Sequence, residues 1–256
     1  MSREKVIQIN SHDRVNLASS QAKFSVSLGK DEHVNSVRAI GIKDLQCVNS
    51  FYNVETYNNT WYYDVGGGEL SIVIPRGQYN ITEFNAAVVT QFLAAGITAT
   101  VVDTPLTHKL AFTFAASISI FRNRSNGELN PIHRLVGIRS GVGGVAVPVA
   151  SYTGEAVHDL SGVKSIYILS NVLAGGYCFT SRNSGSKMAL LDTLPVKVAF
   201  GGVIHHEDAN FEVDSITYDN TLQNNLSTID IELRDSENNL LDTNGLAVVI
   251  LVKVFY

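Results

Sequence analysis

Apolar and polar residues alternate in short stretches along most of this chain, and this two-residue period constrains the fold more than any other feature. Phe24, Val26 and Leu28, for example, alternate with serines, as in a strand with one buried face. Further stretches of strand character occupy residues 37–48, 52–63, 97–102, 110–121, 163–171, 196–203, 229–233 and 246–255. Because strands do not alternate with helices, the pattern favours an all-β, antiparallel sandwich or barrel.

One segment, residues 82–95, departs from this pattern and is typical of a helix. Its apolar side chains fall at helical spacing, and Thr82 is expected to cap its N-terminus. These apolar residues are Phe84, Val88, Val89 and Phe92. A second short helix is expected at residues 131–136, where Pro131 suits a first helical turn.

Three further features predict local structure. The triplet at residues 66–68 consists of glycines and indicates a hairpin tip, since glycine adopts positive φ freely. The polar segment 234–242 is expected to form a hairpin between the last two strands. The seven consecutive apolar residues 246–252 are typical of a strand that is covered on both faces.

The sequence predicts an N-terminal arm followed by one domain. Residues 1–20 carry few apolar side chains in any period and are expected to form an arm with at most one short strand, at 5–9. Residues 21–256 contain no repeat or linker that would divide them. Within this single domain we expect a helical excursion at about 80–137 and a glycine-rich loop at about 137–162.

Composition excludes several classes of protein. The net charge of −5 argues against a nucleic-acid or anionic-membrane binder that works by charge. No apolar run is long enough to span a membrane. Charged residues make up 17% of the chain, against about 25% in an average soluble domain, which suits a protein that packs against neighbours. The two cysteines, Cys47 and Cys178, are expected to be buried, reduced thiols.

The segment His205-His206-Glu207-Asp208 is the best candidate for metal binding. Imidazole and carboxylate groups hold zinc or iron, but adjacent residues of a strand point in opposite directions, so only His205 and Glu207 would share a site. A cupin-like metalloprotein needs further ligands in a tight motif, and the sequence shows none. A solvated turn is the simpler interpretation.

Candidates for catalysis are weaker. The glycines of residues 141–144 superficially resemble a phosphate-binding loop, but β-branched residues and a proline follow them instead of a helix, so a surface loop is favoured. The sequence contains no nucleophile elbow, and neither cysteine lies in a recognisable catalytic context. We therefore expect no enzymatic activity and no cofactor.

The aromatic segment around Trp61, Tyr62 and Tyr63 allows a second kind of function. These side chains could stack against sugars in a jelly-roll, lectin-like carbohydrate-binding module. In a β protein, however, an aromatic stripe is more often part of the core. The sequence leaves both interpretations open.

Several segments are informative when they are taken in order along the chain. They are Gln8-Ile9-Asn10-Ser11-His12-Asp13-Arg14, Asn49-Ser50-Phe51-Tyr52-Asn53-Val54, Ile74-Pro75-Arg76-Gly77-Gln78-Tyr79-Asn80, Ile229-Asp230-Ile231-Glu232-Leu233-Arg234-Asp235 and Leu240-Leu241-Asp242-Thr243-Asn244-Gly245. Together these segments resemble one family, the penton (vertex) or minor capsid proteins of virophages, Polinton-like elements and related large double-stranded DNA viruses. The similarity extends over nearly the whole chain.

This resemblance implies a single jelly roll of two facing four-stranded sheets, assembled as a homopentamer at the five-fold vertices of a capsid. It implies double-jelly-roll major capsid proteins as partners, with other minor capsid proteins or a host surface as further candidates. The protein would reside in the virion after synthesis in the host cytoplasm or a virus factory. Residues 1–20 would then reach beneath the shell or to adjacent capsid proteins, and their deletion is expected to leave a folded protein that fails to join the shell. Members of the family differ in what they insert between strands, which allows for a small extra domain.

Overall fold

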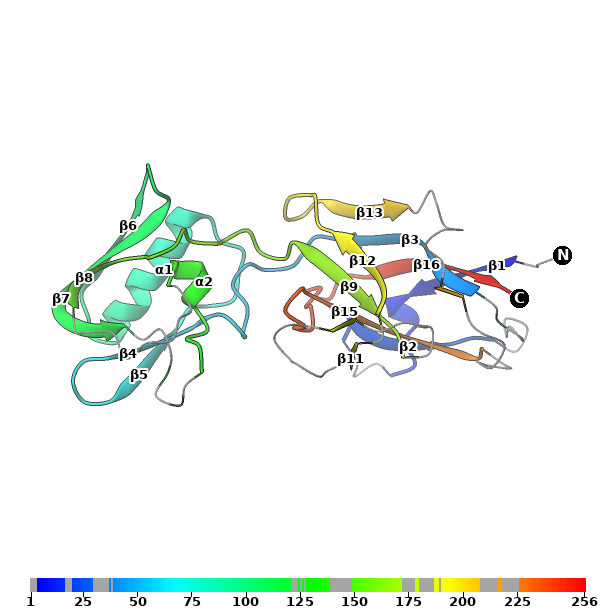
Figure 1. Cartoon of the computed structure of the whole chain (residues 1–256), viewed down its shortest axis with the longest axis horizontal. Helices are drawn as coiled ribbons and strands as arrows, with labels where there is room; N and C mark the ends of the chain where they lie inside the picture. Colours follow the sequence, from blue (N-terminus) through cyan, green and yellow to red (C-terminus); the bar gives the residue numbers. More distant parts are fainter. Residues whose placement is uncertain are drawn as a thin grey trace. The chain divides into compact units, whose positions relative to one another are not determined.

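The computed structural model describes residues 4–16, 20–29, 37, 39–120, 124, 126, 128–138, 149–171, 178–179, 187–188, 190–207, 216–217 and 226–256. The chain divides into two compact units (Figure 1). Unit 1 comprises Met1–Phe51 and Val163–Tyr256, and unit 2 comprises Tyr52–Gly162. Each unit has a separate hydrophobic core.

Unit 2 is larger than the helical excursion expected at about 80–137. Strands that precede and follow that excursion bury their apolar side chains against its helix, so they belong to the same core. Instead of the single domain expected over residues 21–256, the chain forms two units, and the second is inserted in the sequence of the first. The pattern of alternating residues continues through both units, which is why it did not mark this boundary.

Unit 1 has the topology of a jelly roll. Two antiparallel sheets have the strand orders β1-β16-β3-β13 and β12-β9-β15-β2. When only these eight strands are numbered along the chain, strands one, eight, three and six form one sheet, and strands five, four, seven and two form the other, as in a jelly roll. The bounds are β1 (Glu4–Asn10), β2 (Lys23–Ser27), β3 (Ala39–Val48), β9 (Ser165–Leu169), β12 (Leu190–Pro195), β13 (Val203–Glu207), β15 (Thr228–Arg234) and β16 (Val248–Phe255). The expected all-β, single jelly-roll sandwich is confirmed.

Three short strands and one 3₁₀ turn complete the described part of unit 1. Strand β14 (Ile216–Thr217) pairs with β3, and β10 (Cys178–Phe179) pairs with β11 (Lys187–Met188). The 3₁₀ turn η1 (Ser11–Asp13) follows β1, and the Asn10 side chain caps it by accepting a hydrogen bond from the backbone N–H of His12.

Strand β1 corrects the prediction of an N-terminal arm. A strand does occur where one was expected, at 5–9, but it pairs with β16 from Glu4↔Phe255 to Asn10↔Val249. Ile7 and Ile9 are buried in the core between the two sheets. Residues 4–10 are thus an integral strand of the jelly roll, because the two isoleucines supply the period-two pattern that a half-buried strand needs.

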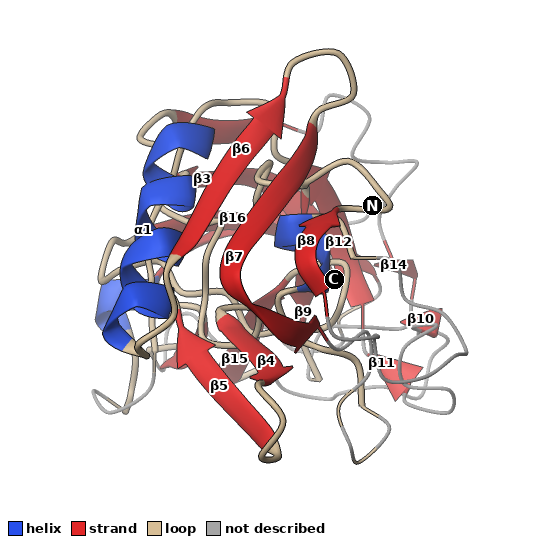
Figure 2. Cartoon of the chain, turned by 90° about the vertical axis from the view of Figure 1, so that its left-hand side faces the viewer, coloured by secondary structure: helices blue, strands red, loops and turns tan. Residues whose placement is uncertain are grey.

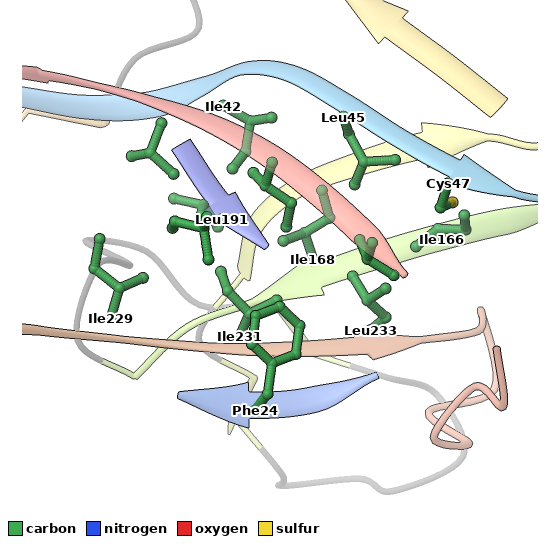
Figure 3. Packing of buried hydrophobic residues seen from close by; sticks show 14 of the residues in the cluster. Phe24, Ile42, Leu45, Cys47, Ile166, Ile168, Leu191, Ile229, Ile231 and Leu233 are labelled. Carbon is green, nitrogen blue, oxygen red and sulfur yellow. The ribbon is translucent and has the colours of Figure 1, made fainter. Parts of the chain in front are cut away.

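The core of unit 1 lies between its two sheets (Figure 3). Every second residue of β15 points into it, as do Leu45 and Cys47 of β3 from the opposite sheet. These β15 residues are Ile229, Ile231 and Leu233. Strand β16 shows the same alternation, with Val248, Ile250, Val252 and Val254 fully buried. Its other face is half-buried, so the prediction of a strand covered on both faces is wrong within the described residues.

The polar segment 234–242 forms a tight turn, but it does not join two paired strands. The Asp235 carboxylate accepts hydrogen bonds from the backbone N–H groups of Glu237 and Asn239, both at 2.8 Å. The chain returns briefly along β15 through a bridge from Arg234 to Leu240. It then crosses to the other sheet, where β16 pairs with β1 and β3. The expected hairpin between the last two strands is therefore wrong.

Unit 2 packs one sheet against a helix (Figure 2). The strand order is β5-β4-β7-β6, with β8 also paired to β7. The bounds are β4 (Thr60–Asp64), β5 (Glu69–Val73), α1 (Ile81–Ala94), β6 (Ala99–Thr104), β7 (Lys109–Ile120), α2 (His133–Val136) and β8 (Val149–Thr153). The glycine triplet lies at the tip of the β4–β5 hairpin as predicted, with Gly66 and Gly68 at positive φ.

Helix α1 occurs where it was expected, but a different residue caps it. The Asn80 side chain accepts a hydrogen bond from the backbone N–H of Glu83, and the Glu83 carboxylate accepts one from the Asn80 N–H. This reciprocal capping box places the start of the helix ahead of Thr82. The second predicted helix is present as α2.

Candidate functional site

The aromatic segment proposed for sugar stacking lies mostly in the core of unit 2. Trp61 is fully buried, with its ring centroid 5.2 Å from that of Phe92 and 5.0 Å from that of Phe112, both edge-to-face. Tyr63 is also buried and packs on Phe92. Because neither ring reaches the surface, the sugar-stacking hypothesis is wrong for these two residues.

Tyr62 points away from that core and is half-buried. The guanidinium carbon of Arg124 lies 4.0 Å from the centroid of its ring, so a cation covers one face of the aromatic system. The backbone of Tyr62 is held by Asn130, whose side-chain amide donates to the Tyr62 carbonyl at 3.0 Å. Tyr62 therefore contacts the segment that follows β7, through Arg124 and Asn130. The ring face under Arg124 is not free to stack against a sugar.

His205 and Glu207 lie on the exposed face of β13. The Nε2 atom of His205 is 3.2 Å from Oδ1 of Asp44 on the neighbouring strand β3, and Glu207 lies opposite Asp44 in the sheet register. His205 thus has a carboxylate neighbour on its own sheet. Within the described ranges, no three histidine, cysteine or acidic residues gather as a metal site would need.

Cys47 is a buried thiol, as predicted. Burial raises its pKa to about 12, which keeps it protonated and unreactive. The side chain of Cys178 and Asp208 lie outside the described residues. Residues 139–148 of the glycine-rich loop, which include the glycines of residues 141–144, also lie outside them. No described helix has the length and apolar character to cross a membrane.

The outer face of the sheet β1-β16-β3-β13 is the first candidate surface for assembly. Two valines, Val6 and Val203, are 44% and 59% exposed there, and β16 adds half-buried apolar side chains between them. Two polar contacts also lie on this face. Lys253 Nζ lies 2.8 Å from Glu4 Oε2, and His205 lies beside Asp44. Exposed valines beside half-buried apolar side chains are suited to burial against another protein.

The opposite sheet presents a polar outer face. Glu232 is flanked by Lys23, at 2.6 Å, and by Arg234, at 2.8 Å. Burial opposes the ionisation of Glu232, but the hydrogen bonds from Lys23 and Arg234 outweigh it and hold the pKa of the carboxyl below its usual value. Asp230 accepts hydrogen bonds from Ser170 and from the backbone of Asn171. The two outer faces of the jelly roll thus differ in chemistry.

Within unit 2, a cluster of polar side chains joins the beginning of the unit to residues that come later in the chain. Asn53 is buried and donates to the carbonyl oxygens of Tyr79 and Leu160. Glu55 nearby accepts two hydrogen bonds from Arg76, at 2.7 and 2.9 Å. Asn53 lies in one of the segments that carry the family resemblance, but no pattern in the sequence indicates that its side chain binds distant backbone groups.

Comparison with known proteins identifies relatives by fold but not by sequence. No protein-family model matches this chain. No curated protein matches it by sequence. Among solved structures, the crystal structure of the selenomethionine-labelled mavirus penton protein matches with a TM-score of 0.50 and 10% sequence identity. The match covers 98% of this chain and 99% of that chain, so it extends over both units. At this identity the match shows a shared fold.

Proposed function

We propose that this chain is a structural protein of a viral capsid, a penton that forms homopentamers at the five-fold vertices and contacts double-jelly-roll major capsid proteins. The observation that carries the proposal is the fold match over nearly the whole of both chains. A jelly roll alone occurs in proteins of many functions, but this match includes the inserted unit as well. The segments quoted above point to the same family from the sequence. The proposal assigns the chain no catalytic role and no cofactor.

The surface chemistry of unit 1 supports assembly into a ring. In a closed ring of identical copies, one face of each protomer meets a different face of the next. The jelly roll has two unlike outer faces: one carries Val6 and Val203, and the other carries the charged cluster around Glu232. The low charge fraction of 17% also limits repulsion where five copies converge.

The oligomeric mass in solution tests this proposal. We expect light scattering or native mass spectrometry to detect a species of about five protomers at high protein concentration, or on co-expression with the major capsid protein. Electron microscopy of that species should show a five-fold ring. A chain that stays monomeric under both conditions, and that does not join the shell in co-expression, would contradict the penton assignment.

A pair of matched variants locates the contact. Leu251→Asp places a charge on the outer face of β16, and Ser27→Asp places the same charge on the outer face of β2 in the opposite sheet. If the apolar face is buried in the ring, the protein concentration at which the Leu251 variant forms pentamers should rise by about tenfold or more, because a buried unpaired charge destabilises the contact. Loss of pentamer in both variants would mean that the two unlike outer faces meet in the ring. Loss in the Ser27 variant alone would place the contact on the polar face only and would leave the penton assignment standing.

A further inference from the structure

An open groove in unit 2 runs between helix α1 and strand β6, which lie beside each other (Figure 2). Its volume is about 450 Å³, within the range of protein ligand sites. The helix contributes Thr82, Asn85 and Val89 to its wall, and the strand contributes residues 101–103. These helix residues are three to four positions apart and so share one side of α1.

The strand side of the groove follows the edge of β6. Side chains of consecutive strand residues point to opposite faces of a sheet, so a groove that contacts Val101, Val102 and Asp103 together lies along the strand's edge and not over one face. On its other side β6 pairs with β7 from Ala99 to Thr104. No strand within the described residues pairs with β6 on the groove side. An edge of this kind can accept an added strand.

Two hydrogen-bond acceptors in the groove wall lack donors. The Oδ1 atoms of Asn85 and Asp103 are buried and have no hydrogen-bond partner among the described residues. Two imidazole groups lie near Asp103: the Nδ1 atom of His108 is 3.8 Å from its Oδ2, and the Nδ1 atom of His158 is 3.9 Å from its Oδ1. Both distances are beyond hydrogen-bond distance. The Nδ1 atom of His158 instead lies 2.8 Å from the carbonyl oxygen of His108. Either acceptor can therefore turn toward a donor in the groove without breaking a hydrogen bond.

A ligand with a primary ammonium group on an aliphatic chain fits both the polar and the apolar residues that line this groove. An ammonium group has three donors and no acceptor, which suits a carboxylate, an amide oxygen and the Thr82 hydroxyl. Its methylene stem can lie along Val89 and Val101 while the charged end remains at the polar groups. A lysine side chain on an extended backbone would present both parts at once, with its main chain along the free edge of β6.

We propose that this groove binds an extended, lysine-bearing segment of another protein, which adds a strand to β6 and places its ammonium group at Asp103 and Asn85. The inference stands apart from the penton assignment, because it rests on contacts within unit 2 alone. It gives the inserted unit a binding role that the jelly roll does not provide.

The test uses the full-length ¹⁵N-labelled chain and a blocked pentapeptide with a central lysine between valines and threonines. We expect saturable shifts of the backbone amide signals of β6 and of the first half of α1. A peptide with norleucine in place of lysine should bind about tenfold more weakly, since it keeps the stem and loses the charge. Asp103→Asn should weaken the lysine peptide by a similar factor. Asn85→Ala should also weaken it, and alanine favours the helix.

The matched control is Asp64→Asn. It removes the same charge from unit 2 in a turn outside the groove, and asparagine can still accept hydrogen bonds there. Binding of the lysine peptide should be unchanged in this variant. The proposal is overturned if the lysine peptide causes no saturable shifts, if norleucine binds equally well, or if Asp64→Asn weakens binding as much as Asp103→Asn does. Equal binding of n-pentylamine, which has no peptide backbone, would overturn strand addition.

Discussion

The side chain of Asn53 joins the first residues of unit 2 to its last ones, because its amide Nδ2 donates to the carbonyl oxygen of Leu160 at 2.9 Å. The two residues are 107 positions apart in the chain. The same side chain also donates to the Tyr79 carbonyl and accepts from the Tyr79 N–H. Gly162 packs closely beside it, at a positive φ of 70°. Asn53 therefore closes unit 2 where the chain enters and leaves it.

Replacement of Asn53 by alanine should destabilise unit 2. The change removes three hydrogen bonds and leaves buried backbone groups without partners, at an expected cost of about 2–4 kcal/mol in the free energy of unfolding. Denaturant unfolding followed by tryptophan fluorescence measures this loss. Asn126→Ala, at an exposed position of the same unit, should change the midpoint little. Equal midpoints for both variants would contradict the role of Asn53.

Trp61 provides a probe that is specific to unit 2, because it is the only tryptophan of the chain and lies in that unit's core. Trp61→Ala should cost about 3–5 kcal/mol, since it empties a large, closely packed site. Hydrogen exchange of the helix α1 amides measures the loss in the absence of the fluorophore. Leu106→Ala, at a side chain that is 97% exposed, should leave exchange nearly unchanged. Wild-type exchange rates in the Trp61 variant would argue against this packing.

Ile9→Ala tests whether the N-terminal strand belongs to the jelly roll. Ile9 is fully buried between the sheets of unit 1, so the variant should lose about 2–5 kcal/mol, measured by circular dichroism during denaturation. Val6→Ala changes an exposed side chain on the same strand and should cost much less. The Trp61 fluorescence midpoint should shift little in either variant, because the two cores are separate. An unchanged stability of the Ile9 variant would favour a detachable arm.

Glu232 should make the stability of unit 1 depend on pH. Its pKa in the folded protein is lowered, so the ionised carboxylate stabilises the fold above its unfolded pKa of about 4.3. That contribution is lost as the pH falls through the lower folded value. Glu232→Gln should therefore be less stable than the wild type at pH 7, by about 1 kcal/mol, and nearly equal to it near pH 2.

Urea unfolding at a series of pH values measures this difference. Glu207→Gln, at an exposed position of β13, is the control and should show a smaller effect at every pH. A stability difference for Glu232→Gln that stays constant from neutral to acid pH would contradict the assigned ion pairs with Lys23 and Arg234.

Local patterns predicted the elements of this fold but not their assignment to sheets. The alternation at Ile229, Ile231 and Leu233 identified a half-buried strand, and the structure buries these residues. The polar turn after it looked like a hairpin, yet the next strand belongs to the opposite sheet. The turn at Asp235 is local, whereas the choice of sheet depends on pairing with β1 and β3, which lie about 200 or more residues away in the sequence.

For the candidate sites, too, local sequence patterns identified the segments, and only the tertiary structure showed which residues lie together. The aromatic segment around Trp61 was recognised from composition, but only the packing against Phe92 and Phe112 shows that it is core. Asn85 and Val89 lie in the segment 82–95, where the spacing of apolar residues predicted a helix. That they share a groove with Asp103 depends on how α1 lies against β6, and the sequence contains no periodicity that relates the two elements.

The sequence by itself determined that this protein is built from antiparallel strands with one substantial helix, because burial of one strand face or one helix side leaves a period in the residues. The tertiary structure decided that residues 52–162 form a separate core, that the first strand is an edge of the jelly roll, and which surfaces carry unpaired polar groups. These properties depend on contacts between segments that are distant in the sequence. Such contacts produce no local periodicity from which they could be predicted.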